Sequence, residues 1–186
     1  SNENPHGASP PAVRAIVDAL AGIHVYPDPL GGDLKCALAS HHGIATASLL
    51  LGNGSHELLM QFAQVFAGPG DEVVASQFGF AVYALAAQAA GAQLRQAPAL
   101  PITHAMRRGH DLAALRDAIG PRTKVVYLAN PNNPTGTWFA SDAFVEFMAQ
   151  VPANVIVVVD EAYAELADAP DYASALPLVA RHPNLV

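Results

Sequence analysis

Apolar residues follow two alternating patterns along the 186 residues of this chain. Some repeat every three to four positions, as in residues 58–66, and give a helix one apolar face. Others form short uninterrupted runs, such as VVYLA before Asn130 and VIVVV before Asp160. Continuous apolar runs are typical of parallel strands that helices cover on both faces. The alternation predicts an α/β fold with three α/β/α layers around a mostly parallel sheet.

Cap and turn residues set the expected boundaries of these elements. Ser9 and Asp111 are typical helix N-caps, and Gly43, Gly91 and Gly120 are typical helix ends. We expect helices over residues 10–20, 33–42, 80–90, 111–119 and 141–150, and another whose apolar face covers residues 58–66. We expect strands over residues 47–51, 72–76, 92–97, 124–129 and 154–159. One domain with an appended arm accounts for this order.

Composition narrows the class of protein. Apolar residues make up 52% of the chain, charged residues only 13%, and the formal net charge is −7. Because no basic cluster extends beyond Arg107-Arg108, nucleic acid is not an expected partner. The single cysteine, Cys36, cannot form an internal disulfide and fits a reducing compartment. No signal peptide or membrane-length apolar run is visible, so we expect a cytoplasmic protein with no membrane partner.

Two polar motifs directly follow two of the predicted strands, where ligands bind in open α/β sheets. They are NPNNPTG at residues 130–136 and DEAY at residues 160–163. A carboxylate such as Asp160 at the end of an apolar strand needs a partner. A pyridinium nitrogen is such a partner, because the carboxylate keeps the ring protonated and makes it a better electron sink. Asn133 and Tyr163 could donate to a neighbouring ring oxygen. Alternatively, Asp160 only caps a following helix.

Two further segments belong to the same predicted edge. GNGSHE, residues 52–57, opens a helix, and its backbone N–H groups suit a phosphate. It lacks both the dinucleotide and the Walker spacing, so an ordinary turn stays an alternative. Phe80 could stack on a flat ring, with the small Ala162 against the other face, or Phe80 could be a core aromatic like Phe78 and Tyr83.

Other chemistries lack their motifs. The eight histidines show no zinc-ligand spacing, so no metal site is expected. The GxSxG motif of Ser/His/Asp hydrolases is missing. A nicotinamide dehydrogenase is disfavoured because the glycine fingerprint is missing.

With these motifs in place, the chain resembles the pyridoxal-phosphate aminotransferases of fold type I. The resemblance covers nearly all residues and rests on NENPHG, VYPDPLGG, GNGSHELL, FAVYALAAQAAGA, NPNNPTG and VVVDEAYAEL. NPNNPTG and DEAY indicate the superfamily, while NENP and YPD narrow the resemblance to its histidinol-phosphate branch. It implies an N-terminal arm and dimer-contact segment over residues 1–43. Residues 44–186 would then be the cofactor-binding large domain, incomplete at its C-terminus.

The resemblance implies a role for each residue around the cofactor ring. Asp160 would pair with the pyridine nitrogen of pyridoxal 5'-phosphate, and Asn133 and Tyr163 would pair with its phenolic oxygen. Phe80 would stack on the ring and Ala162 would lie against its other face. Asp160 and Tyr163 are therefore the catalytic candidates within this chain.

The resemblance also implies contacts at the phosphate and the substrate. The phosphate would be held by the backbone of Gly54, Ser55 and His56. Tyr26 would reach the phosphate of the neighbouring subunit's cofactor, which requires a homodimer. Asn4 and His6 would lie near the substrate.

The chain departs from the family pattern at several points. His56 stands where the family commonly has an acidic residue, and His6 stands where this branch often has tyrosine. SQFGF lacks the proline that usually precedes the stacking aromatic, which leaves Phe78 as a second candidate. The Schiff-base lysine follows DEAY by two dozen or more residues in the family, whereas this chain has only Lys35 and Lys124. We therefore expect that lysine, and the arginine for the substrate carboxylate, outside this chain.

The resemblance implies transamination between L-histidinol phosphate and 2-oxoglutarate, giving imidazole acetol phosphate and glutamate in histidine biosynthesis. The expected partners are therefore a small-molecule amino donor, a 2-oxo acid and a second subunit. An aminotransferase for aromatic amino acids and a phospho-amino-acid decarboxylase share the fold and stay alternatives. A third alternative is a lysine-free homologue that binds a ligand without catalysis.

Overall fold

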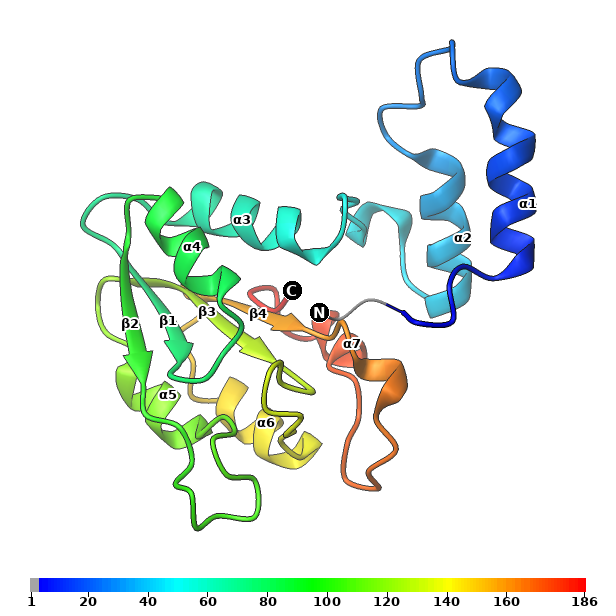
Figure 1. Cartoon of the computed structure of the whole chain (residues 1–186). Coiled ribbons are helices and arrows are strands. Elements are labelled where there is room, and N and C mark those ends of the chain that lie inside the picture. The colour runs from blue at the N-terminus through cyan, green and yellow to red at the C-terminus, as the bar shows by residue number, and fades with distance from the viewer. Residues whose placement is uncertain (1–3) are drawn as a thin grey trace. The chain divides into compact units, whose positions relative to one another are not determined.

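Contacts divide the chain into two units, Ser1–Leu51 and Gly52–Val186. The structure, a computed structural model, describes residues 4–186 (Figure 1). Asn2 and Glu3 of the N-terminal motif lie outside the described residues. The expected domain boundary between residues 43 and 44 stays a prediction, and the contact boundary falls eight residues later in the chain.

The N-terminal unit consists of helices joined by turns. Its elements are α1 (Pro10–Ala19), η1 (Leu20–Gly22), α2 (Gly32–His42) and η2 (Thr46–Ser48). The Ser9 hydroxyl accepts a hydrogen bond from the Ala12 N–H at 3.4 Å, as expected of an N-cap. Gly43 ends α2 at a φ of +67°, a left-handed conformation that glycine adopts without strain. Both predicted helices are confirmed.

The strand expected over residues 47–51 is wrong. Thr46–Ser48 form a 3-10 turn, residues 49–51 are irregular, and Leu50 is 57% exposed. A short apolar run has the same appearance in a strand and in other buried or partly buried segments. A strand also needs a neighbour to pair with its backbone, and ASLLL has none among the described residues.

The C-terminal unit alternates helices and strands as predicted. Its elements are α3 (Ser55–Phe66), β1 (Glu72–Ser76), α4 (Val82–Ala89), β2 (Gln93–Ala97), α5 (Leu112–Ala118), β3 (Thr123–Ala129), α6 (Ser141–Met148), β4 (Ile156–Asp160), η3 (Ala164–Leu166) and α7 (Leu176–Val179). Asp111 caps α5 by accepting from the N–H groups of Ala113 and Ala114 at 3.0 and 3.1 Å. The predicted boundaries of these strands are confirmed to within two residues, whereas η3 and α7 were not expected.

All four strands are parallel, in the order β2-β1-β3-β4. The chain moves outward from β1 to β2 and then crosses back over β1 to start β3. Because parallel crossovers are right-handed, this reversal puts α4 on one face of the sheet and α5 and α6 on the other. Figure 1 shows α3 and α4 together on the first face. The β1–β3 boundary is therefore a topological switch point, where ligands bind at the carboxyl ends of the strands.

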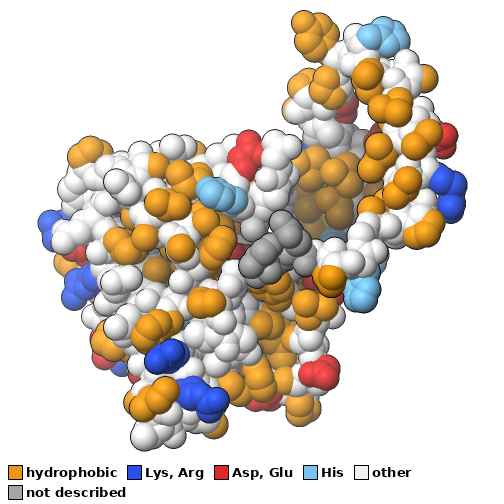
Figure 2. Space-filling model, in the orientation of Figure 1, with side chains coloured by type: hydrophobic (Ala, Val, Ile, Leu, Met, Phe, Trp, Pro, Cys, Tyr) orange, Lys and Arg blue, Asp and Glu red, His pale blue; other side chains and the backbone are white. Residues whose placement is uncertain are grey.

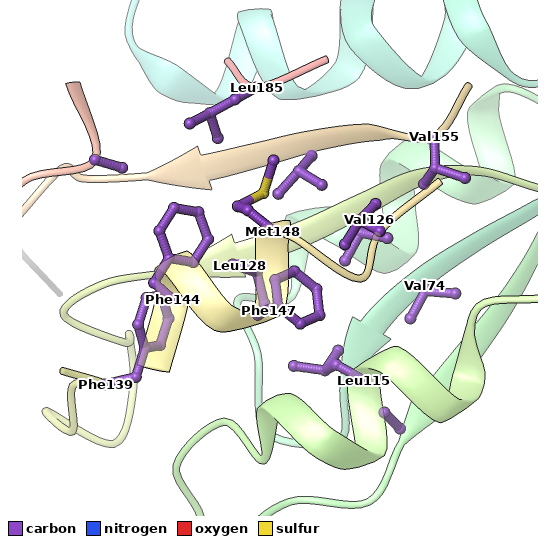
Figure 3. Packing of buried hydrophobic residues seen from close by; sticks show 14 of the residues in the cluster. Val74, Leu115, Val126, Leu128, Phe139, Phe144, Phe147, Met148, Val155 and Leu185 are labelled. Carbon is purple, nitrogen blue, oxygen red and sulfur yellow. The ribbon is translucent and has the colours of Figure 1, made fainter. Parts of the chain in front are cut away.

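Side-chain alternation along the strands builds a separate core on each face. Toward α5 and α6, Val74 of β1 and Val126 and Leu128 of β3 pack against three phenylalanines, Phe139, Phe144 and Phe147, as Figure 3 shows. Toward α3 and α4, the core contains two tyrosines, Tyr83 and Tyr127, together with small and β-branched residues.

Residues 184–186 extend the sheet beside β4. The Val157 N–H donates to the Asn184 carbonyl at 2.8 Å, and the Val186 N–H donates to the Val157 carbonyl at 2.9 Å. The bridge between Val157 and Leu185 is parallel. The outer edge of β4 is therefore paired along part of its length.

Exposed apolar side chains gather on the N-terminal unit, as the orange atoms of Figure 2 show. Helix α1 buries none of its residues, and Val13, Ile16, Val17 and Leu20 are 47% to 61% exposed. Among the described residues, no helix is long and apolar enough to cross a membrane.

Candidate active site

Asp160 ends β4 and faces the side of the sheet covered by α3 and α4. Strand alternation dictates this orientation, because Val158, two residues earlier, belongs to the core on that face. The Asp160 carboxylate accepts from the Tyr83 hydroxyl at 3.3 Å and from the Ala162 N–H at 3.2 Å. Burial raises the pKa of the carboxyl, and these two donors lower it again in part. A partly buried carboxylate with only weak protein partners has room for a further donor.

Tyr83 connects Asp160 to the core. Its ring is buried, lies stacked on Tyr127 with a centroid distance of 4.9 Å, and donates from its hydroxyl to Asp160. Tyr127 donates to the Leu59 carbonyl of α3 at 2.6 Å. Burial raises the pKa of both phenols, so both stay protonated donors at neutral pH.

One cleft of about 220 Å³ joins the end of β4 to the beginning of α3. Ser55, Leu58, Leu59 and Phe62 of α3 line it on one side, and residues 158–162 line it on the other, with Val186 completing the wall. The cleft therefore brings together three of the predicted cofactor contacts, which are Ser55, Asp160 and Ala162.

The first turn of α3 has free backbone donors. Gly54, the N-cap, has a φ of +82° and provides no side-chain cap. The Glu57 carboxylate instead accepts from the backbone and side-chain N–H groups of Asn53, and these two bonds lower its pKa. The N–H groups of Ser55 and His56 therefore point out of the helix start, at the positive end of its dipole, where an anion binds.

The two candidate stacking aromatics differ in their surroundings. The Phe80 ring meets Tyr83 edge-on at 5.9 Å, beside the residue that contacts Asp160. Phe78 is engaged elsewhere, because the Arg108 guanidinium covers its ring at 5.3 Å and its carbonyl accepts from the Asn132 amide at 3.0 Å. These contacts favour Phe80, and its stacking role stays a prediction.

The NPNNPTG motif forms a closed loop after β3. The Asn132 N–H donates to the Thr137 carbonyl at 2.7 Å, and the Gly136 N–H donates to the Asn132 carbonyl at 2.8 Å. The Asn130 amide exchanges hydrogen bonds with the backbone of Phe139. The peptide bonds before both prolines are cis. Asn130 and Asn132 of this motif therefore stabilise the loop.

Asn133 is the asparagine of this loop that the structure leaves available. Its half-buried amide makes no hydrogen bond within the described part of the chain.

The residues of the DEAY motif also differ in role. Glu161 accepts from the Ser174 hydroxyl and the Ala175 N–H, both at 2.6 Å, and so holds the segment before α7. Asp160 and Glu161 both line the cleft, but the Glu161 carboxylate is occupied by Ser174 and Ala175, and Tyr163, half-buried, begins the turn that follows.

The predicted residues of the N-terminal unit are described within that unit alone. Asn4 closes a tight turn, donating to the Gly7 carbonyl and accepting from the His6 N–H at 3.0 Å. The Tyr26 side chain is 98% exposed. Their assignments to the substrate and to a neighbouring subunit's phosphate stay predictions.

Two contributors escaped the sequence reasoning. The sequence pattern predicts only a core role for Tyr83, yet Tyr83 lies three residues after Phe80, and its N–H donates to the Phe80 carbonyl at 3.1 Å as α4 begins. His110 is buried, and its Nε2 accepts from the Ala129 N–H at 3.0 Å at the end of β3. No sequence motif marks the contact of Tyr83 with Asp160 or that of His110 with Ala129, because both join residues far apart in the chain. Within the described residues no group of His, Cys, Asp and Glu could hold a metal ion.

The chain is similar to known proteins over its whole length. The family model for aminotransferase class I and II matches residues 1–186. Histidinol-phosphate aminotransferase 2 of Pseudomonas fluorescens is 48% identical over the whole chain, which covers 49% of that relative. The corresponding enzyme of Pseudomonas aeruginosa is also 48% identical, with the same coverage. The chain therefore spans about half the length of these curated relatives.

Solved structures give the same picture of the fold. The histidinol-phosphate aminotransferase of Sinorhizobium meliloti, crystallised with pyridoxal-5'-phosphate, superposes with a TM-score of 0.90 at 32% identity, covering 100% of this chain and 49% of that one. An aspartate aminotransferase variant of Thermus thermophilus superposes with a TM-score of 0.86 at 23% identity, covering 98% and 52%. The predicted three-layer α/β/α fold of the fold type I aminotransferases is confirmed.

Proposed function

The chain belongs to the aminotransferase class I and II family, and on that premise we propose that it forms the cofactor-binding part of a pyridoxal-phosphate-dependent transaminase. The observation that carries the proposal is the placement of Asp160. Its carboxylate lies on a cleft that also includes the free N-terminus of α3. A carboxylate and a helix start on one cleft match the two charged ends of pyridoxal phosphate, a pyridinium nitrogen and a phosphate.

The donor set fits this cofactor. When bound, pyridoxal phosphate supplies an electron sink for negative charge at the α-carbon of an amino acid. The Asp160 carboxylate keeps a proton at the ring nitrogen, and Tyr83 holds that carboxylate by a hydrogen bond. The Asn133 amide and the Tyr163 hydroxyl donate to the ring oxygen. Phe80 and Ala162 cover the two faces and exclude water, and the N–H groups of Gly54, Ser55 and His56 bind the phosphate.

The lysine of such an enzyme is not supplied by either lysine of this chain. Lys124 lies at the amino end of β3, 3.9 Å from Asp71, whereas Asp160 lies at the carboxyl end of the neighbouring strand. Lys35 belongs to α2 of the N-terminal unit. We therefore assign the chemistry to a protein as long as the curated relatives, which are about twice the length of this chain.

The proposed substrate is L-histidinol phosphate, with 2-oxoglutarate as amino acceptor, in histidine biosynthesis. The support is the 45% to 48% identity over the whole chain to relatives named histidinol-phosphate aminotransferase. We further propose a cytoplasmic homodimer in which Tyr26 reaches the neighbouring site and Asn4 and His6 contact the substrate. The exposed apolar residues of α1 support a subunit contact there.

The experiment uses the complete protein with pyridoxal phosphate. Glutamate formation from 2-oxoglutarate is measured with histidinol phosphate, with aromatic amino acids and with threonine phosphate as separate donors, together with carbon dioxide release. We expect the highest kcat/KM with histidinol phosphate and no carbon dioxide. Preference for an aromatic amino acid would indicate an aromatic aminotransferase, and carbon dioxide from threonine phosphate would indicate a decarboxylase. Cofactor binding without turnover of any donor would favour the non-catalytic homologue.

A further inference from the structure

Three consecutive residues, Arg108, Gly109 and His110, contact both loops that flank the β1–β3 switch point. The Arg108 guanidinium lies over the ring of Phe78, which follows β1. The His110 imidazole accepts from the N–H of Ala129, the last residue of β3. This 108–110 segment closes the connection between β2 and α5, and thus comes from neither of the strands that it contacts.

The hydrogen bond to His110 replaces a missing strand contact. Backbone N–H groups alternate in direction along a strand, and the Asn130 N–H donates toward β4, to the Asp160 carbonyl at 3.0 Å. The Ala129 N–H therefore points toward β1. The β1–β3 pairing ends at Ala75 and Tyr127, two residues earlier. Because a buried N–H requires an acceptor, the imidazole takes the place that a β1 carbonyl holds further back.

The protonation of His110 suits this role. The residue is 6% exposed, and burial lowers its pKa to about 4, so the ring is neutral at physiological pH. A neutral imidazole that accepts at Nε2 carries its proton on Nδ1. The Nδ1 atom is buried and has no hydrogen-bond partner among the described residues. The bond to Ala129 is therefore the polar contact that defines the ring's orientation.

The neighbouring residues fix the 108–110 segment in place. The Leu100 N–H donates to the Gly109 carbonyl at 3.0 Å, and the Arg108 N–H donates to the Leu100 carbonyl at 2.9 Å. A Cβ atom on Gly109 would lie 2.8 Å from the Met106 carbonyl oxygen and 2.9 Å from the hydroxyl oxygen of Thr137. This backbone therefore packs directly on the residue that follows NPNNPTG and accepts from the Asn132 N–H.

We propose that His110 is a positioning residue, which holds the carboxyl end of β3 so that Asn133, four residues beyond Ala129, is directed at the cofactor. This role rests on the proposed function, since it assigns Asn133 to the cofactor ring. His110 itself does not touch the cofactor in this proposal. It acts through Ala129 and the loop that follows.

Three substitutions in the complete protein separate this role from simple packing. His110→Gln keeps a neutral acceptor near the position of Nε2, whereas His110→Leu removes the acceptor and keeps an apolar side chain. His104→Leu is the matched control, because His104 lies exposed in the same loop, where its Nδ1 accepts from the Met106 N–H at 3.0 Å.

The first readout needs no cofactor. Amide hydrogen exchange of a peptide covering residues 125–131 should accelerate at least about 10-fold in His110→Leu and stay within about 2-fold of wild type in His110→Gln and His104→Leu. The second readout is the Kd for pyridoxal phosphate, which should rise about 10-fold in His110→Leu only. Equal losses in the Leu and Gln variants would overturn the proposal, as would a Leu variant that behaves like wild type.

A measurement on the unmodified protein covers the case in which His110→Leu does not fold. In ¹⁵N-histidine-labelled protein, His110 should show the Nδ1–H tautomer throughout pH 5.5–8, and an Nε2–H tautomer would overturn the proposal. The outcome is distinguishable from failure of the proposed function. If the wild type binds no pyridoxal phosphate, the proposed function falls, while the exchange contrast still decides whether His110 holds β3.

Discussion

The two faces of the sheet are both buried, yet their aromatic residues differ in kind. Toward α5 and α6, the side chains of Phe139, Phe144 and Phe147 stack in series and contain no polar atom (Figure 3). Toward α3 and α4, Tyr83 and Tyr127 stack on each other, and each hydroxyl has a hydrogen-bond acceptor. The first face supplies packing alone. The second also carries a hydrogen bond from the core to the cleft, so we expect substitutions on the two faces to separate stability from cofactor binding.

The largest expected effect is on stability and concerns the face of the sheet toward α5 and α6. Phe147→Ala should lower the free energy of unfolding by about 3–5 kcal/mol, because the deleted ring leaves a cavity among Leu115, Leu128 and Phe144. Chemical denaturation of the complete protein without cofactor measures this loss. The Kd for pyridoxal phosphate of the folded protein should stay within about 2-fold of wild type. A parallel loss of cofactor affinity would break the contrast between the faces.

Asp160→Asn tests the other face and should have the opposite profile. Loss of the charge facing the ring nitrogen should weaken pyridoxal phosphate binding by about 100-fold, or roughly 3 kcal/mol. Without cofactor the melting temperature should be unchanged or higher, because burial raises the pKa of this carboxyl and the ionised group therefore costs stability at neutral pH. The exposed Asp168→Asn is the matched control. Lower stability with unchanged affinity would make Asp160 a structural cap, the alternative that its bond to the Ala162 N–H represents.

His110 should make the stability of the folded protein depend on pH. Burial lowers its pKa to about 4, and no charged side chain contributes to this shift. The folded state therefore favours the neutral ring. Its stability contribution is complete above the unfolded pKa of about 6.5 and is lost as the pH falls toward 4, by roughly 2–3 kcal/mol.

Denaturation of wild type and His110→Gln between pH 7.5 and 4.5 measures this contribution. The difference in unfolding free energy between the two proteins should shift in favour of the Gln variant as the pH decreases. Parallel pH profiles would show that His110 titrates normally in the folded protein.

The smallest expected effects come from the two stacked tyrosines, which allow a direct comparison of two similar substitutions. Tyr83→Phe and Tyr127→Phe each remove one buried hydroxyl from stacked neighbours, and each should cost about 1 kcal/mol of stability. Only Tyr83 touches Asp160, so only Tyr83→Phe should weaken pyridoxal phosphate binding, by several-fold, and raise the pKa of Asp160 further. Absorbance titration of the cofactor complex measures both. Identical affinities in the two variants would mean that the tyrosine pair is structural only.

The sequence predicted those parts of the molecule that depend on local pattern. Apolar runs and caps located β1 to β4 and α4 to α6, because periodicity and turn chemistry act within one element. Asp160 could be placed on the binding edge because it ends an apolar strand, where ligands bind in parallel sheets. Ser55 also lies on the cleft, although the strand expected before it is not formed.

Long-range geometry could not be predicted in the same way. The contact of Tyr83 with Asp160 spans 77 residues, and that of His110 with Ala129 depends on where β1 and β3 separate. The wrong strand at residues 47–51 has the same origin, since only the presence or absence of a pairing neighbour distinguishes a strand from an irregular apolar run. Local patterns specify elements, whereas partners depend on topology.

The backbone bonds that close the connection between β2 and α5 also have a consequence for protein engineering. The backbone of Leu100 is hydrogen-bonded to both Arg108 and Gly109, which closes the base of the intervening turn. Thr103 and His104 at the tip of the turn are exposed. A peptide tag inserted between Thr103 and His104 should extend into solvent and leave the melting temperature unchanged. The same tag inserted between Arg108 and Gly109 should unfold the protein or prevent its expression. The loop thus tolerates insertions at its tip but not four residues further along the chain, where its backbone is hydrogen-bonded.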